Sequence, residues 1–133
     1  MGATIIGTGC DLTPVARLEA ACRRHPSLLG RLFTPRELER AGQAGPLRWE
    51  RLAGCFAAKE SVQKALGVGM RLGFMELEVG HEPGGRPVLH LGPGAEELAR
   101  SLGVVRIHLS ISHAGGMALA TALAEGAPGG QTS

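Results

Sequence analysis

One helix-forming run, residues 47–66, constrains the fold of this chain more than any other segment. It can form about five helical turns, and Gly67 follows as a typical helix terminator. Apolar side chains recur along it at the spacing of a stripe that packs on a core, namely Leu52, Cys55, Phe56, Val62 and Leu66. Glu60 and Lys64, four residues apart, share another face, which we expect to be free for a ligand.

Two small residues, Ala53 and Ala57, lie earlier on the face of the Glu60–Lys64 pair. Their side chains would let a molecule outside the helix approach its backbone. Lys59 is one residue off this face, and we expect it to be solvated or to contact a nucleotide. A Glu–Lys pair at this spacing is usually a solvated surface pair worth about 0.2–0.5 kcal/mol. A function for the pair therefore depends on other parts of the chain, which supply an early Asp11 and a late His113.

The remaining chain predicts short strands and helices. We expect strands at 3–10, 75–79, 87–91, 104–112 and 117–123, and further helices at 14–24 and 95–102. Thr13-Pro14 has the form of an N-cap followed by a first helical residue, which places Asp11 at a strand-to-helix junction. Thr34 and Glu37 have the spacing of a capping box. In the strand at 104–112, alternation places four apolar side chains on one face, those of Val105, Ile107, Leu109 and Ile111.

A chain of 133 residues is long enough for one hydrophobic core and too short for two. We expect one domain at 1–126, followed by a disordered tail at 127–133 made of small, polar, glycine and proline residues. The composition, 44% apolar and 20% charged, is that of a soluble globular protein.

Composition also argues against several classes of protein. Aromatic residues make up 3% of the chain and the net charge is +2, so a nucleic-acid partner is not expected. Cys10, Cys22 and Cys55 form no CxxC pair, and we expect buried free thiols in a reducing cytoplasm. No signal peptide or membrane span is predicted, because the apolar run 4–10 stops at Asp11. Leu12 stands where a dinucleotide fingerprint requires its third glycine, which argues against that motif.

Four segments together resemble the motifs of one enzyme family, the holo-acyl-carrier-protein synthases, which are small 4′-phosphopantetheinyl transferases. These segments are Gly9-Cys10-Asp11-Leu12, Leu32 to Glu37, Phe56 to Glu60 with Lys64 to Gly67, and Ser110-Ile111-Ser112-His113. Their order and separations match the family over nearly the whole chain. One departure is Cys55, where the family commonly has an arginine. A thiol cannot make the charge-assisted contact that a guanidinium offers.

The resemblance implies an α+β fold, in which a small, mostly antiparallel sheet packs on a long central helix. It also implies transfer of the 4′-phosphopantetheine group of coenzyme A to a serine of apo acyl carrier protein, with release of adenosine 3′,5′-bisphosphate. The carrier would serve fatty-acid or polyketide biosynthesis. Family members of this size assemble as homotrimers with each active site between neighbouring subunits.

The resemblance also assigns the reacting groups. Asp11 and Glu60 would hold Mg²⁺, which suits an ion that binds one or two carboxylates together with substrate phosphates. Lys64 would stabilise or protonate the leaving phosphate. The general base for the carrier serine stays open between Glu60 and a metal-bound water.

Binding residues follow from the same resemblance. We expect Lys64, Gly67, Ser112 and His113 to contact coenzyme A. Arg17 and Arg24, seven residues apart on one helix face, would dock the acidic carrier protein. The alternatives are a non-catalytic module that binds coenzyme A or a nucleotide, and a scaffold for a carrier-dependent synthase. Neither alternative requires a pair of carboxylates opposite a positioned ammonium.

Overall fold

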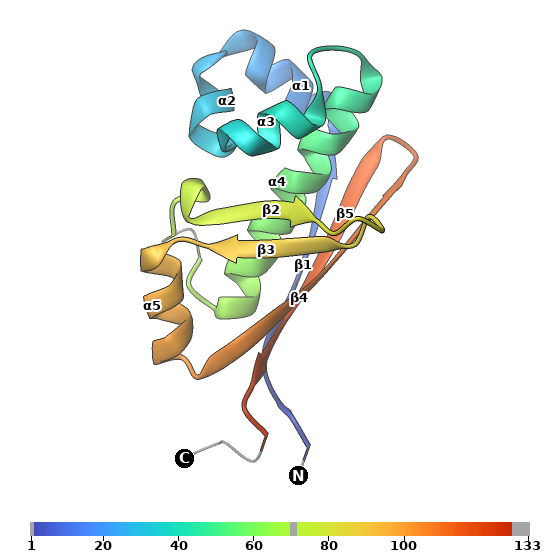
Figure 1. Ribbon diagram of the computed structural model, residues 1–133. Helices are drawn as coiled ribbons and strands as arrows, with labels where there is room; N and C mark the ends of the chain where they lie inside the picture. Colours follow the sequence, from blue (N-terminus) through green and yellow to red (C-terminus); the bar gives the residue numbers. More distant parts are fainter. Residues whose placement is uncertain (1, 70–71, 129–133) are drawn as a thin grey trace.

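The computed structural model describes residues 2–69 and 72–128 (Figure 1). Most of the predicted tail, 127–133, lies outside these residues. No helix within them combines the length and the apolar character needed to cross a bilayer. The elements are β1 (Thr4–Pro14), α1 (Val15–Arg24), α2 (Ser27–Leu32), α3 (Pro35–Ala41), α4 (Pro46–Leu66), the 3₁₀ helix η1 (Phe74–Glu76), β2 (Leu77–His81), β3 (Pro87–Leu91), α5 (Pro93–Ser101), β4 (Val104–Ala114) and β5 (Met117–Gly126).

Two antiparallel sheets pack around α4, which confirms the predicted α+β fold. The larger sheet has the order β1-β5-β4, and the smaller one is the β2–β3 hairpin. Strand β5 pairs along its length with β1 on one side and β4 on the other. Gly115 and Gly116, with φ of 57° and 76°, form the tight turn between β4 and β5. Figure 1 shows the hairpin crossing α4, with α1, α2 and α3 gathered near the start of this helix.

The prediction that the Glu60–Lys64 face of α4 is free holds at Lys64, whose side chain is 53% exposed, and is wrong at Ala53 and Ala57. Ala53 and Ala57 have no exposed surface. The β1 strand comes close to the helix backbone at Ser61. A Cβ built on Gly9 would lie 1.9 Å from the carbonyl oxygen of Ser61. The middle strand, β5, contributes small buried side chains as well, those of Ala118, Ala120, Ala122 and Ala124. Small residues on both sides therefore let the sheet close directly onto the helix.

Lys59 was predicted to be solvated or to contact a nucleotide, and this prediction is wrong too. Its side chain has no exposed surface, and Nζ lies 2.6 Å from Oε1 of Glu37. The same ammonium donates to the carbonyl oxygens of Leu32, at 2.8 Å, and Phe74, at 3.0 Å. The capping box is confirmed, because Thr34 and Glu37 exchange both of its hydrogen bonds. Lys59 thus ties α4 to the ends of three other segments.

Two sequence predictions, the N-cap at Thr13 and the strand face of Val105, are wrong. Strand β1 continues past Thr13, and β4 shifts register at Val105. Strand β1 runs on to Pro14, paired with Met117 of β5, so Thr13 lies in the strand and does not cap α1. Its hydroxyl donates to Oδ2 of Asp11 at 3.0 Å instead. Val105, expected to share a strand face with Ile107, Leu109 and Ile111, is 65% exposed. A register shift between Val104 and Arg106 places Val104 in the core in its stead.

We predict that Gly9→Ala destabilises the protein by more than about 3 kcal/mol, because β1 must move away from α4 to admit a methyl group. The matched control is Gly30→Ala in α2, where an added Cβ meets nothing within 4 Å. That control should be neutral or stabilising by up to about 1 kcal/mol, as expected for a helical glycine. Urea unfolding measures both, and a Gly9→Ala midpoint equal to that of the unsubstituted protein would contradict the packing argument.

Candidate active site

The side chains of Asp11, Glu60 and Lys64 come together where β1 crosses α4. Asp11 is far from the other two in the sequence, and Lys64 follows Glu60 by one helical turn. Nζ of Lys64 lies 3.3 Å from Oδ1 of Asp11 and 2.9 Å from the carbonyl oxygen of Cys10. The absence of a side chain on Gly9 makes this approach possible, since its Cβ would lie 2.9 Å from Cβ of Lys64. The three predicted catalytic side chains therefore form one cluster.

Asp11 and Glu60 line one groove between β1, α1, α2, α4 and η1, which we call the carboxylate groove. Its polar wall also includes Thr13 and Arg17. Its apolar wall is made by Leu12, Leu18, Leu28, Leu32, Phe56 and Phe74, with a contribution from Ala21. The groove therefore joins an apolar trough to two carboxylates, which would repel an anionic ligand unless a cation binds with it.

The electrostatics of the groove favour a divalent cation. Burial raises the pKa of Glu60, the negative charge of Asp11 raises it further, and the ammonium of Lys64 opposes both effects. The described residues contain no cluster of three or more His, Cys, Asp or Glu side chains that could hold a metal ion. Two carboxylates are too few for a structural zinc site, but Mg²⁺ is commonly held by one or two carboxylates, with waters and substrate phosphates as its other ligands. The donor set therefore fits Mg²⁺.

The structure does not bring Ser112 and His113 to this cluster. The two residues belong to β4, which β5 separates from β1. Nε2 of His113 lies 2.8 Å from the carbonyl oxygen of Glu50 in α4. A Cβ on Gly54 would lie 3.0 Å from the same nitrogen, so His113 packs on α4 about two turns before Ser61, where β1 meets the helix. Ser112 comes directly before His113 in the extended strand, so its side chain points to the opposite face of the sheet.

Of Gly67 and the two predicted docking arginines, only Arg17 lines the carboxylate groove. Gly67 ends α4 in a left-handed conformation, φ 71°, one turn after Lys64. Arg17 is exposed and lines the groove beside Asp11. Arg24 is exposed at the far end of α1 and lies outside the groove lining.

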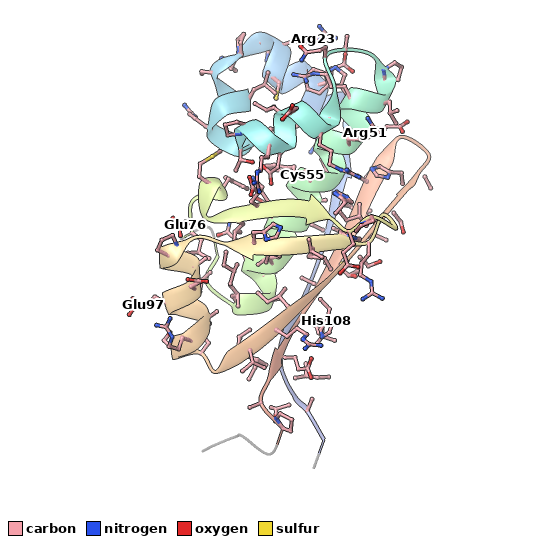
Figure 2. The ribbon with its side chains drawn as sticks, viewed as in Figure 1. Arg23, Arg51, Cys55, Glu76, Glu97 and His108 are labelled. Carbon is pink, nitrogen blue, oxygen red and sulfur yellow. The ribbon has the colours of Figure 1, made fainter. Side chains whose placement is uncertain are left out.

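A second cavity, of about 190 Å³, lies on the His113 side of α4, and sequence reasoning missed it. We call it the basic cavity, because its polar lining includes Arg40, Arg51, His81 and His113. These residues come from α3, α4, β2 and β4, so no single stretch of sequence contains them. Figure 2 shows two residues of its wall, Arg51 and Cys55, along α4 near the hairpin. The only local signal was their spacing of four residues, which places both on one helix face.

The cysteines differ in part from expectation. All three are free thiols, and Cys22 and Cys55 are buried as predicted, whereas Cys10 is exposed. The Cys55 thiol has a pKa well above its usual value, chiefly because it is buried and secondarily because the Glu37 carboxylate is near. Cys55 is therefore neutral and supplies no charge to the basic cavity.

Comparison with known proteins gives a consistent result. A model of the 4′-phosphopantetheinyl transferase superfamily matches residues 7–122. The chain is 43% identical over 122 residues to a holo-acyl-carrier-protein synthase of Clostridium novyi, covering 91% of this chain and 88% of that protein. It is 44% identical over 128 residues to the Streptomyces coelicolor protein of the same name, covering 92% and 99% of the two chains.

Solved structures show the same relationship. The holo-acyl-carrier-protein synthase of Neisseria meningitidis superposes with a TM-score of 0.83 at 33% identity, covering 91% of this chain and 98% of that one. The Helicobacter pylori synthase, solved in complex with coenzyme A, gives a TM-score of 0.76 at 28% identity, covering 88% and 98%.

We predict that Glu60→Gln stabilises the metal-free protein at neutral pH. A carboxyl group whose pKa is raised by folding destabilises the folded state when it is ionised, and this cost disappears below its unfolded pKa. The gain in unfolding free energy should therefore grow as the pH rises through the raised pKa of Glu60, and should vanish below about pH 4.

Urea unfolding in chelator-treated buffer from pH 4 to pH 8 measures this effect. Glu97→Gln, at an exposed position of α5 labelled in Figure 2, is the matched control and should show no such trend. Equal behaviour of the two variants would show that the Glu60 carboxylate is not under electrostatic strain.

Proposed function

The chain belongs to the 4′-phosphopantetheinyl transferase superfamily, among the holo-acyl-carrier-protein synthases, and we propose that its carboxylate groove is the active site. It transfers the 4′-phosphopantetheine group of coenzyme A to a serine of apo acyl carrier protein, giving holo carrier protein and adenosine 3′,5′-bisphosphate. The observation that supports this location is that Asp11 and Glu60 line one groove while Lys64 Nζ lies 3.3 Å from Oδ1 of Asp11.

Asp11 and Glu60 would hold Mg²⁺. When bound, the ion neutralises charge on the pyrophosphate of coenzyme A and makes its phosphorus more electrophilic. The charge of Asp11 acts on the pKa of Glu60, which supports a position in which one cation contacts both carboxylates. The Thr13 hydroxyl, 3.0 Å from Oδ2 of Asp11, orients this carboxylate toward the groove.

Different residues of the chain handle the proton of the carrier serine and the charge of the leaving phosphate. The serine oxygen of the carrier bonds to the β-phosphorus of coenzyme A, and the bond from that phosphorus to the bridging oxygen breaks. Glu60, which lines the groove, is the carboxylate placed to accept the serine proton. Lys64 stabilises the negative charge that develops on the leaving phosphate, or donates a proton to it. The Cys10 carbonyl oxygen holds its ammonium at the groove.

We predict that Asp11→Asn lowers transfer by at least about a thousandfold and removes its response to Mg²⁺ concentration. Lys64→Met should lower kcat by about a hundredfold, with little change in coenzyme A affinity or in the Mg²⁺ requirement, because its charge acts on the transition state. Intact mass of apo carrier after incubation with coenzyme A measures the transfer, and Arg100→Gln on α5 is the control. Near-normal turnover of Asp11→Asn at limiting Mg²⁺ would contradict the metal role of Asp11.

We further propose that coenzyme A lies between subunits of a homotrimer. Asp11 lines the carboxylate groove and His113 lines the basic cavity, and β5 separates their strands, so the two residues do not share a cavity within one chain. The face of the three-stranded sheet turned away from α4 carries Leu12, 59% exposed, together with Leu119 and Leu123 of β5. An apolar sheet face of this kind is typical of subunit contacts. In the trimer, the groove of one chain would meet His113 of the partner subunit, with Ser112 and Gly67 at the margins of the site.

We predict a solution mass three times that of the 13.8 kDa chain, measured by light scattering. Asp11→Asn and His113→Ala should each impair transfer alone. Refolding the two variants together should restore part of the activity, because mixed trimers contain some sites built from two unsubstituted halves. A fully active monomer at micromolar concentration would contradict the trimer, and failure of complementation would contradict the shared site.

Arg17 and Arg24 are the residues we propose for carrier docking. The two exposed guanidinium groups are seven residues apart on α1, about 10 Å along its axis, and Arg17 borders the groove that the carrier serine must enter. Arg23 is engaged elsewhere, since it pairs with Glu19 at 2.8 Å and lies 5.6 Å from the Trp49 ring. Acyl carrier proteins are acidic, so exposed positive charge at this point would raise their encounter rate.

We predict that Arg17→Glu and Arg24→Glu each raise the KM for the carrier by several-fold or more at low ionic strength, and flatten its salt dependence. The KM for coenzyme A should stay the same. Arg100→Glu, on α5, controls for the change in net charge. Unchanged carrier kinetics in both variants at low salt would place the docking surface elsewhere.

The carrier and the compartment are further proposals. We propose a cytoplasmic enzyme that serves fatty-acid or polyketide synthesis, which the three free thiols support. The alternative of a non-catalytic module or a scaffold is disfavoured by the placement of Lys64 beside Asp11, which binding alone does not require. Transfer to purified carriers of both classes would identify the physiological one.

A further inference from the structure

Gln63, near the end of α4, is a buried amide to which the proposed reaction gives no role. The residue is 1% exposed. Within residues 2–69 and 72–128, its Nε2 has no hydrogen-bond partner, and a buried donor left in this way costs free energy. A methionine would occupy a similar volume without that cost. Stability alone therefore does not account for an amide at this position.

Two oxygens of Gln63 hold the chain where it leaves α4 and where it approaches η1. The backbone oxygen accepts a hydrogen bond from the Val68 amide at 3.3 Å. Together with the left-handed Gly67, this bond forms a Schellman motif at the end of the helix. The side-chain Oε1 accepts from the Leu72 amide at 3.2 Å. One residue thus fixes both the departing and the returning chain.

Lys59 holds the same returning segment from one turn earlier on α4. Its Nζ donates to the carbonyl oxygen of Phe74 at 3.0 Å. The segment Leu72–Phe74 is therefore bound at both ends, by an acceptor from Gln63 and a donor from Lys59. Leu72 is half-buried, so its amide can turn to water if the Gln63 oxygen is removed. Loss of this oxygen would free one end of the segment and leave the other end attached.

The segment Leu72–Phe74 forms part of the wall of the carboxylate groove. Phe74 lines the groove, and its ring stacks on that of Phe56, with centroids 5.5 Å apart and planes inclined by 20°. The wall on the α1 side of the same groove includes Arg17, the residue proposed to dock the carrier. The position of Phe74 therefore determines the shape of the apolar trough next to the proposed docking surface.

We propose that Gln63 is a positioning residue for carrier binding, which holds Leu72–Phe74 so that Phe74 keeps its place in the groove wall. The inference rests on the proposed function, because it takes the carrier as the partner that enters this groove. Gln63 is not part of the groove lining. It therefore acts through the segment and does not contact the carrier itself.

The substitution Gln63→Met keeps the side-chain volume and removes the oxygen. It should raise the KM for the carrier by about two- to tenfold, the loss expected for one neutral hydrogen bond, and leave kcat and the KM for coenzyme A nearly unchanged. The urea midpoint should stay the same or rise, because the unpaired Nε2 is removed as well. Gln43→Met, in the exposed loop before α4, is the matched control and should change none of these quantities. An unchanged carrier KM in Gln63→Met would overturn the proposal, whatever happens to the midpoint.

Amide hydrogen exchange at Leu72, followed by nuclear magnetic resonance, tests the contact without transfer. This amide should exchange at least about fivefold more slowly in the unsubstituted protein than in Gln63→Met. The Val68 amide should be equally protected in both, since it bonds to the backbone. An unprotected Leu72 amide in the unsubstituted protein would refute the contact, even if the variant failed to fold. Active transfer with an unchanged carrier KM in Gln63→Met would refute this inference alone. A protected Leu72 in a protein that modifies no carrier would refute the proposed function, and with it the carrier role of Gln63.

Discussion

The contact between β1 and α4 is the constraint on which the rest of this structure depends. Gly9 lets the strand approach the helix so closely that a methyl group would meet the Ser61 carbonyl oxygen at 1.9 Å. Asp11 follows Gly9 by two residues in β1, and at this separation of strand and helix its Oδ1 lies 3.3 Å from Nζ of Lys64. The contact between β1 and α4 therefore both packs the core closely and brings Asp11 and Lys64 together. A larger residue in the strand would separate Asp11 from Lys64 as well as loosen the core.

A buried ion pair fixes the opposite side of the helix. Lys59 and Glu37 are fully desolvated, and removing one partner of such a pair typically costs about 3–5 kcal/mol because the other charge stays buried. The pair holds the end of α2, η1 and β2 against α4 through backbone hydrogen bonds. It also sets the charge of the basic cavity, since a free Glu37 carboxylate would oppose an anion there. One interaction thus contributes to both the stability of the fold and the chemistry of a candidate site.

Local signals predicted the long helix, the capping box and the cluster of Asp11, Glu60 and Lys64, because each depends on spacing within a segment or on a resemblance carried by motifs. Predictions failed where a distant partner decides the outcome. Lys59 neighbours a groove residue in sequence, but Glu37, 22 positions away, determines that it is buried. Val105 obeys the alternation of its strand, but a register shift against β5 turns it outward. The basic cavity draws on four elements, so no periodicity within one of them could indicate it.

A helix buried almost all round in a domain of this size leaves little room for a site on its own surface. A side chain of α4 can reach a ligand only where the strands and helices that cover α4 leave it open. Two such openings lie along α4. Glu60 and Lys64 emerge beside β1, whereas Arg51 emerges between α3 and the hairpin. The two openings face different directions around one rigid helix. A substrate with two anionic parts therefore fits poorly into both openings of one chain. The apolar face of the three-stranded sheet supplies a surface through which a second chain can complete the match. In the proposed trimer, substrate binding and subunit association would be parts of one requirement, set by the burial of α4.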